Sequence, residues 1–162
     1  MNNNQIVERF KSQKSICSYE TEISALPSVV FPLLCPVLEY DWIDGWSCEM
    51  IYTKSGVAEE LCVFKTTNPS FGEETWVCTR YELNKAIRYT RYSENIIANL
   101  DIELFEMSNR KSMLVWTMTI ISLNESGNEL IKNNDQEVTS EILKGINVLL
   151  EYYVTTGWKL VK

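Results

Sequence analysis

The amino-acid sequence predicts an α+β fold in which an antiparallel sheet curves around one long C-terminal helix. Segments with alternating apolar and polar side chains recur between residues 15 and 123, as in strands with one buried and one solvated face. Residues 137–156 form the only long segment with helical periodicity. Because this single helix follows the strands and has one apolar face, it needs a concave sheet surface to cover that face.

The C-terminal helix is predicted from its apolar spacing and from signals at both ends. Asn134, three residues before Glu137, is typical of a capping box, although Asn133 and Asp135 leave the first helical residue open. Gly157 stands where helices commonly end. The apolar side chains that recur at spacings of three to four residues are expected to share the buried face: Val138, Ile142, Ile146, Leu149 and Tyr153.

Seven strands and two short helices are expected before this helix. The strands are predicted at residues 15–23, 46–53, 61–67, 75–82, 86–92, 99–106 and 112–123. The short helices, at residues 28–35 and 36–43, lie between the first two strands, and Pro27 is well placed to begin the first of them. The polar connection 124–135 has room for one helical turn near residues 129–131.

Length and composition indicate one globular domain. The chain has 162 residues, of which 45% are hydrophobic and 23% charged. We expect this domain to span residues 15–162 and residues 1–14 to form a flexible arm. The net charge of −7 opposes binding to nucleic acid or to anionic membranes. The sequence has no apolar run of about 18 residues and no apolar core of a signal peptide, so we expect a cytoplasmic location.

The cysteine and histidine contents exclude several kinds of site. The chain has 5 cysteines, an odd number, and no CxxC pair, which indicates reduced and buried thiols. It has no histidine, and therefore lacks the commonest general base and the commonest metal ligand. We expect no metal ion and no cofactor.

Four segments of the chain are similar to parts of one protein superfamily. Residues 30–50, VFPLLCPVLEYDWIDGWSCEM, resemble the stretch of the SRPBCC superfamily (the START and birch-pollen-allergen fold) in which two short helices lead into the second strand through a Trp-x-x-Gly-Trp element. Residues 74–77 and 115–119 resemble its fourth and seventh strands, and residues 149–157 resemble the end of its long helix. The similarity extends from about Tyr19 to Gly157 and points to an uncharacterised subgroup.

This resemblance implies the helix-grip fold. In that fold a seven-stranded antiparallel curved sheet wraps around a long C-terminal helix, two short helices lie between strands 1 and 2, and a cavity lies between sheet and helix. The resemblance is a weak guide to function, because the superfamily includes lipid carriers, hormone receptors, polyketide cyclases and chaperone activators.

Side-chain alternation assigns each predicted strand an outer and an inner face. Charged residues mark the outer face: Glu20, Glu22, Glu49, Lys65, Asp101 and Glu103. The expected cavity lining is Tyr19, Cys48, Met50, Tyr52, Cys62, Phe64, Val77, Thr79, Tyr81, Ile87, Tyr89, Ile102, Leu104, Trp116 and Met118 on the strands, with Ile142, Ile146, Leu149 and Tyr153 on the helix. This lining suits a hydrophobic or aromatic ligand with one or two polar groups, although the same side chains could simply fill a core.

Arg91 is the most distinctive candidate ligand-binding residue. It has the same parity as Ile87 and Tyr89 and should point inward, where a guanidinium needs a carboxylate or an anionic ligand. It is therefore a candidate anchor for a ligand carboxylate or phosphate. Two alternatives remain open: Arg91 lies at a strand end and reaches water, or a rival register turns Arg80 and Arg88 inward instead.

Two further groups of residues have the chemistry of a possible site: acidic pairs and tryptophans. The carboxylate doublets Glu59–Glu60 and Glu73–Glu74 are expected on solvated faces or turns, because neither has the alternation that an internal acid–base pair would need. Trp42 and Trp46 occupy the region of the cavity entrance in the similar superfamily, where they either gate the cavity or anchor the short helices to the edge of the sheet.

Three functions follow from these observations. The first is binding or transport of a hydrophobic or aromatic small molecule in the cavity. The second is an enzyme of the polyketide-cyclase or dehydratase kind, although the sequence shows no nucleophile–base pair. The third is a protein-interaction module of the chaperone-activator type, which would have an exposed apolar patch. A homodimer formed by pairing of an edge strand is compatible with all three.

Overall fold

The computed structural model describes residues 10–161, so most of the expected N-terminal arm lies outside the described residues. The strands are β1 (Lys14–Ile23), β2 (Glu49–Tyr52), β3 (Val63–Asn68), β4 (Gly72–Glu82), β5 (Ala86–Tyr92), β6 (Ile96–Glu106) and β7 (Ser112–Ser122). The helices are α1 (Pro27–Leu33), α2 (Glu125–Asn133) and α3 (Gln136–Thr156), with short 3-10 turns η1 (Glu39–Asp41) and η2 (Ser108–Arg110).

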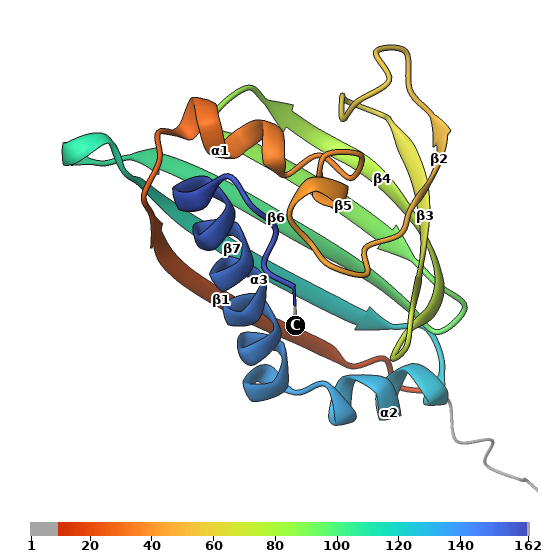
Figure 1. Ribbon diagram of the computed structural model, residues 1–162. Helices are drawn as coiled ribbons and strands as arrows, with labels where there is room; N and C mark the ends of the chain where they lie inside the picture. Colours follow the sequence, from red (N-terminus) through yellow and green to blue (C-terminus); the bar gives the residue numbers. More distant parts are fainter. Residues whose placement is uncertain (1–9, 162) are drawn as a thin grey trace, which may run out of the picture.

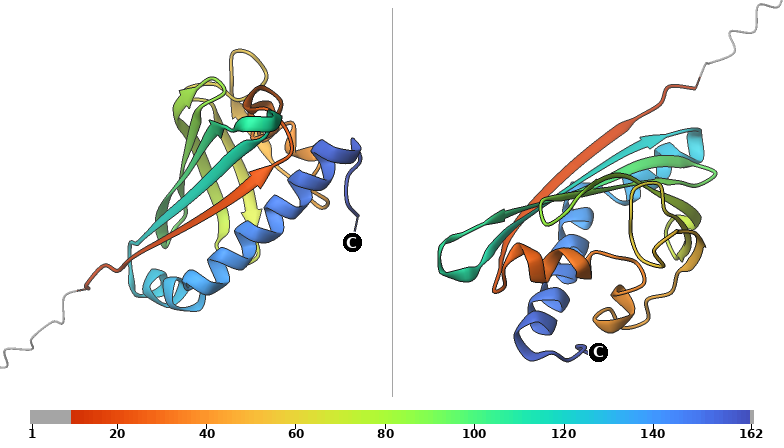
Figure 2. Two further views of the ribbon diagram at one scale, coloured as in Figure 1. Left: turned by 90° about the vertical axis from the view of Figure 1, so that its left-hand side faces the viewer. Right: turned by 90° about the horizontal axis from the view of Figure 1, so that it is seen from above.

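The strands form one antiparallel 7-stranded sheet in the order β1-β7-β6-β5-β4-β3-β2. The sheet curves, and α3 crosses its concave side while α1 covers the same side near one end (Figure 1). Figure 2 shows α3 running diagonally beside β1, with the sheet as the opposite wall. The main apolar core lies between sheet, α1 and α3, and a smaller one lies under α2. The predicted fold class is confirmed.

The two ends of α3 are fixed by different residues. Asp135 is the N-cap, because its side chain accepts a hydrogen bond from Val138 N at 3.0 Å. The expectation that Asn134 caps this helix was wrong. Asn134 is buried at the end of α2, where its Nδ2 donates to Leu130 O. Gly157 ends the helix as predicted, with a left-handed φ of 75° that glycine adopts without strain.

The Asp135 cap makes a first testable prediction. We expect Asp135→Ala to lower the free energy of unfolding by about 1 kcal/mol, because the first-turn N–H of Val138 loses its acceptor. Chemical denaturation followed by circular dichroism measures the loss. Asp135→Ser keeps a capping oxygen and should retain most of the stability; an equal loss in both variants would contradict the capping role.

The buried face of α3 is rotated from the one predicted. Its buried residues are Thr139, Leu143, Asn147 and Leu150. The predicted Ile146, Leu149 and Tyr153 are partly buried and pack against the core. Val138 and Ile142 are instead exposed, Ile142 by 52%. The apolar pattern was misleading because the buried face includes two polar residues whose hydrogen bonds are satisfied inside the protein.

The short helical segments contribute buried side chains to the main core on the concave side of the sheet. Phe31 and Leu34 are buried there, and the Tyr89 hydroxyl donates to Leu34 O at 2.9 Å. The second predicted short helix is reduced to the single turn η1. Trp42 is fully buried and donates through Nε1 to Leu33 O, so it anchors this segment.

A β-bulge changes which side chains of β4 point inward. The pairing with β5 shifts between Cys78 and Arg80, so Cys78 lies opposite Tyr89 and Trp76 opposite Arg91. One extra residue in β4 reverses the inward and outward positions on the far side of the bulge. The inward placements of Val77 and Thr79 were therefore wrong, and Thr79 Oγ1 lies 3.0 Å from Thr90 Oγ1 on the outer face.

A second irregularity affects the edge strand β2. The register shifts between Met50 and Tyr52, and Tyr52 pairs with Val63 instead of following the alternation of Met50. Tyr52 is 49% exposed, so its inward placement was also wrong. Both errors have the same cause, because a bulge breaks the period of two on which face assignment depends.

The described part of the N-terminal segment is held against the sheet. Gln13 N donates to Ser122 Oγ at 2.7 Å, and Ser12 Oγ donates to Ser122 O at 2.7 Å. Strand β1 begins at Lys14, one residue earlier than predicted. Within residues 10–161 no helix is both long and apolar enough to cross a membrane.

Candidate functional site

A cavity of about 310 Å³ lies between the sheet, the first half of α3 and the loops before β2 and between β3 and β4. Its volume is at the lower end of the range for small-molecule sites. It is lined by Gly45, Trp46, Ser47, Thr66, Thr67, Asn68, Phe71, Glu74, Trp76, Arg91, Leu100, Trp116, Met118, Ile120, Asn134, Thr139, Ile142, Leu143 and Ile146.

Only part of the predicted lining reaches this cavity. Five of the predicted site residues line it: Arg91, Trp116, Met118, Ile142 and Ile146. Most of the others belong to the packed core or pack against it: Tyr19, Cys48, Met50, Cys62, Phe64, Tyr81, Ile87, Tyr89, Ile102, Leu104, Leu149 and Tyr153. Tyr52 and Thr79 lie on exposed surfaces. Part of the interior is therefore packed core, to which α1 and the segment after it contribute side chains, and part of it is cavity.

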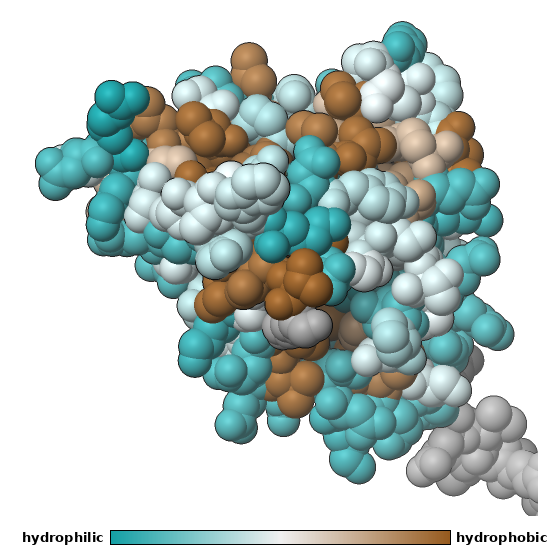
Figure 3. Space-filling model, in the orientation of Figure 1, coloured by the Kyte–Doolittle hydropathy of each residue, from teal (hydrophilic) through white to brown (hydrophobic). Residues whose placement is uncertain are grey.

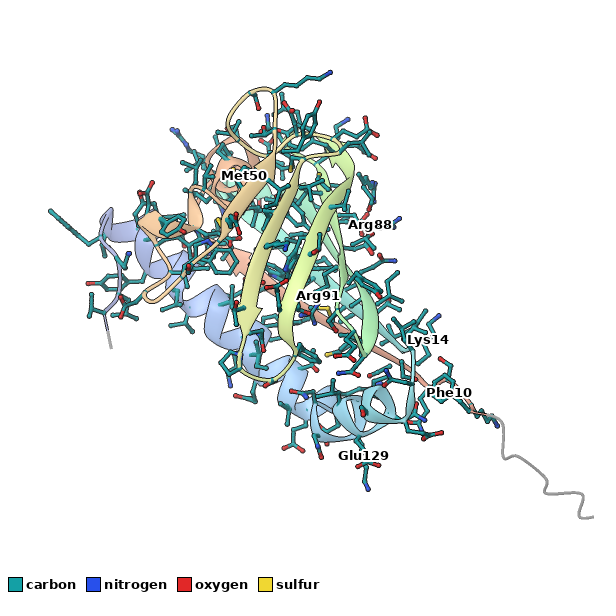
Figure 4. The ribbon with its side chains drawn as sticks, turned by 90° about the vertical axis from the view of Figure 1, so that its right-hand side faces the viewer. Phe10, Lys14, Met50, Arg88, Arg91 and Glu129 are labelled. Atoms are coloured by element: carbon teal, nitrogen blue, oxygen red, sulfur yellow. The ribbon has the colours of Figure 1, made fainter. Side chains whose placement is uncertain are left out.

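The wall of the cavity contains a buried ion pair between β4 and β5. Arg91 is 4% exposed and Glu74 is 1% exposed. A single guanidinium nitrogen, Arg91 Nη1, donates to both carboxylate oxygens of Glu74, at 2.8 and 2.9 Å. The expectation that the Glu73–Glu74 doublet is solvated was wrong for Glu74, because the bulge in β4 turns this side chain inward. Figure 4 shows Arg91 within the molecule, whereas Arg88 of the same strand lies at its periphery.

The Arg91 guanidinium keeps free hydrogen-bonding capacity on its other edge. Among the described residues, Arg91 Nε is the one buried side-chain nitrogen or oxygen that lacks a hydrogen-bond partner. Nη2 lies 3.8 Å from Met118 Sδ, a weak acceptor. The rings of Phe71 and Trp76 lie 4.6 and 5.2 Å from Arg91 Cζ and hold the guanidinium in place. The guanidinium is therefore held in one position, with one buried N–H that has no hydrogen-bond partner.

Burial dominates the protonation of the pair. Desolvation raises the pKa of the Glu74 carboxyl above its ordinary value, although the charge and hydrogen bond of Arg91 oppose the shift. Desolvation also lowers the pKa of Arg91, against the effect of Glu74, but an arginine remains protonated in a protein. The site therefore holds a permanent cation beside a carboxylate that is a stronger base than an exposed glutamate.

The indole N–H groups of the three tryptophans that line the cavity have partners inside the protein. Trp116 Nε1 donates to Asn147 Oδ1 at 3.0 Å, and Trp76 Nε1 donates to Thr66 Oγ1 at 2.9 Å. Trp46, which also lines the cavity, donates through Nε1 to Pro36 O at 2.8 Å and is held in place by this bond.

The sequence showed Arg91 but not its partners. Trp76, Phe71 and Glu74 were missed, since the alternation without a bulge put Val77 and Thr79 on the inner face instead. The large apolar ring of Trp76 was the only local signal that this position faces inward. The charge of Glu74, two residues earlier, indicated that the same face is solvated. Within residues 10–161 no group of three or more Cys, Asp or Glu side chains is placed to hold a metal ion.

Sequence comparison finds no match, whereas structural comparison finds proteins of similar fold. No protein-family model matches the sequence, and no curated protein matches it. Norcoclaurine synthase from Thalictrum flavum, solved with dopamine and hydroxybenzaldehyde, is similar to this chain with a TM-score of 0.66 and 12% identity over 96% of this chain and 94% of that one. The Zhui aromatase/cyclase from Streptomyces sp. R1128 has a TM-score of 0.66 and 12% identity over 91% of this chain and 100% of that one.

An uncharacterised protein from Rhizobium leguminosarum has a TM-score of 0.61 and 12% identity, covering 88% of this chain and 97% of that one. At these identities the similarity shows the fold alone. The expected fold is confirmed, and this chain has the helix-grip fold.

Proposed function

We propose that this protein binds an uncharged, mainly apolar small molecule in its internal cavity, with one ligand oxygen accepting a hydrogen bond from Arg91. The observation that supports this most directly is that Arg91, whose buried Nε has no hydrogen-bond partner, is one of the residues that line the cavity. A buried donor left unpaired costs about 1–3 kcal/mol, so a ligand acceptor at this position would gain a corresponding advantage. The volume of about 310 Å³ suits a ligand of one or two rings.

The charge of the site favours a neutral ligand over an anionic one. Glu74 already neutralises Arg91 at 2.8 Å. A ligand carboxylate would bring a second negative charge next to Glu74 in a poorly solvated space, which is unfavourable unless one carboxyl takes up a proton. The sequence suggested that Arg91 anchors a ligand carboxylate or phosphate. We instead propose that it donates to a carbonyl or hydroxyl oxygen of the ligand.

Helix-grip relatives support a small-molecule role in general terms. The solved norcoclaurine synthase contains dopamine and hydroxybenzaldehyde, and a second neighbour is described as an aromatase/cyclase. The interaction-module alternative has less support. Among the described residues on the face drawn in Figure 3, hydrophobic side chains form separate groups divided by hydrophilic ones.

A matched set of probes tests the proposal. We expect wild-type protein to bind 2-tetralone, an uncharged bicyclic ketone, about 10-fold more tightly than tetralin, which has the same carbon skeleton without the oxygen. The carboxylate analogue, 1,2,3,4-tetrahydro-2-naphthoate, should bind more weakly than the ketone. Isothermal titration calorimetry gives the three affinities, and quenching of Trp76 and Trp116 fluorescence shows that the ligand occupies the cavity.

Two variants test whether the ion pair causes the difference in affinity between the ketone and the hydrocarbon. Glu74→Met combined with Arg91→Met removes both charges and the guanidinium donors, and should bind the ketone and the hydrocarbon equally. Arg88→Met is the control, because Arg88 lies on the same strand but pairs with Asp101 outside the cavity. Equal affinity of wild-type protein for ketone and hydrocarbon would contradict the role of Arg91.

A further inference from the structure

Met118 lies at the wall of the cavity, beside the buried ion pair. Among the described residues, its sulfur is the one acceptor for Arg91 Nη2, at a distance of 3.8 Å. A thioether sulfur accepts hydrogen bonds only weakly. Arg91 Nη1 has the carboxylate of Glu74 as its acceptor, and Arg91 Nε has no partner within residues 10–161. Within this part of the chain, only Nη1 therefore has a strong acceptor.

Addition of one oxygen atom to Met118 would supply a strong acceptor at this position. Methionine sulfoxide carries its oxygen on Sδ, and the group is polar but has no net charge. An N–H···O hydrogen bond spans about 2.9 Å between its heavy atoms. Because Sδ and Nη2 are 3.8 Å apart, an oxygen bonded to Sδ reaches Nη2 along a bent path with little movement of either side chain. Since the sulfoxide is uncharged, it adds no charge repulsion against Glu74.

We propose that Met118 is an oxidation site, at which a hydroperoxide forms methionine sulfoxide that accepts a hydrogen bond from Arg91 Nη2 and lowers the affinity of the cavity for its ligand. The added oxygen would take up space in the cavity and compete with the ligand for the guanidinium. The effect on ligand affinity rests on the proposed function. The contact between the sulfoxide and Arg91 does not depend on it.

The oxidation consumes one hydroperoxide, and its atoms and electrons balance. A lone pair on Sδ attacks the outer peroxide oxygen, so that an S–O bond forms while the O–O bond breaks. The transferred oxygen then gives its proton to the departing alkoxide or hydroxide, which leaves as an alcohol or as water. Sulfur loses two electrons, and the two oxygen atoms of the peroxide gain them.

The position of Met118 distinguishes it from two other methionines of the described chain. Met118 is only partly buried and lines the cavity, so a small peroxide can reach Sδ from the cavity. Met50 packs against the main core and does not line the cavity. Met113 is an odd number of residues from Met118 along β7 and therefore lies on the outer face of the sheet. A buried sulfoxide normally costs stability, but at Met118 the guanidinium supplies a donor.

Met118→Gln tests the hydrogen bond without an oxidant. Glutamine carries a carbonyl oxygen on its δ-atom, where methionine sulfoxide carries its oxygen on Sδ, and it is likewise uncharged. Met118→Leu is the matched apolar control. We expect Met118→Gln to melt at or above the temperature of Met118→Leu, because Arg91 Nη2 donates to the new oxygen. In the Glu74→Met plus Arg91→Met background, the glutamine variant should instead melt about 5 °C below the leucine variant, since its amide is then unpaired.

Peroxide treatment tests the modification itself. After exposure to hydrogen peroxide, peptide mass spectrometry should find a sulfoxide at Met118 while circular dichroism shows that the protein is still folded. Isothermal titration calorimetry with 2-tetralone should then give an affinity about 10-fold weaker than before treatment. Met118→Leu treated in the same way should keep its affinity, whatever sulfoxides form at Met50 and Met113.

Any of three results would overturn the proposal. The first is no sulfoxide at Met118 in folded protein at a peroxide dose that oxidises Met113. The second is an unchanged affinity for 2-tetralone after complete oxidation of Met118. The third is a glutamine at this position that lowers the melting temperature equally in both backgrounds. If untreated wild-type protein does not bind 2-tetralone, the proposed function fails and the effect on ligand affinity fails with it, whereas the melting temperatures still decide whether Arg91 donates to an oxygen on this side chain.

Discussion

Glu74→Met should be strongly destabilising, by about 3–5 kcal/mol, because it leaves Arg91 buried without a counter-charge. The guanidinium is 4% exposed and remains protonated, so the folded protein has no means of neutralising it. Replacing both residues by methionine removes the unpaired charge and should recover most of the loss. We expect the stability losses of the two single substitutions to add up to much more than the loss of the double substitution.

Urea denaturation of the wild-type protein and these three variants measures the coupling between Glu74 and Arg91. Arg91→Met should cost less than Glu74→Met, since an isolated glutamate can take up a proton. Burial then holds the Glu74 pKa further above its ordinary value near 4.5, and the folded state binds more protons than the unfolded chain. The stability of Arg91→Met should therefore fall as the pH rises above that value. Additive losses that do not depend on pH would contradict this account of the pair.

Gly127→Ala should be the second strongly destabilising substitution, with a net loss of about 1–3 kcal/mol. A Cβ atom on Gly127 would lie 2.2 Å from Asn95 O and 3.0 Å from Ser122 Cβ. The close partner is backbone at the turn between β5 and β6, so α2 itself would have to move. The higher helix propensity of alanine, worth up to about 1 kcal/mol, offsets only part of this cost.

Gly145→Ala should have the opposite effect on the free energy of unfolding and serves as the control. Gly145 lies in α3, and apart from its own stretch of helix backbone nothing lies within 4 Å of the position of an added Cβ. The substitution should raise the free energy of unfolding by about 0.5–1 kcal/mol through helix propensity alone. Thermal or urea denaturation compares the two variants. Similar effects of Gly127→Ala and Gly145→Ala would show that the approach of α2 to Asn95 is not tight.

The order of elements could be read from local patterns. Alternation gave seven strands, turn residues separated them, and a single amphipathic segment ending at Gly157 gave α3. These signals are local because each depends on residues within one strand or one turn of helix. The inward direction of Arg91 also followed from local parity with Ile87 and Tyr89, since β5 has no register shift within itself.

The composition of the cavity could not be read in the same way. The extra residue at the β4 bulge exchanges Val77 and Thr79 for Glu74 and Trp76 on the inner face, and the shift at β2 removes Tyr52. Polar Thr139 and Asn147 on the buried face of α3 likewise rotate that face away from its apolar pattern. Each of these outcomes depends on a partner from another element, such as Trp116 for Asn147.

The sequence by itself thus determined the strands, the long helix and the presence of an inward arginine. Only the tertiary structure decided that this arginine pairs with Glu74 and that its Nε has no hydrogen-bond partner. It also decided that the short helical segments contribute to the packed core. The physical reason is that periodicity reports on the neighbours of a residue along the chain, whereas the pairing of a buried charge depends on the register between strands. A bulge of one residue changes that register without changing the hydrophobic pattern enough to be recognised.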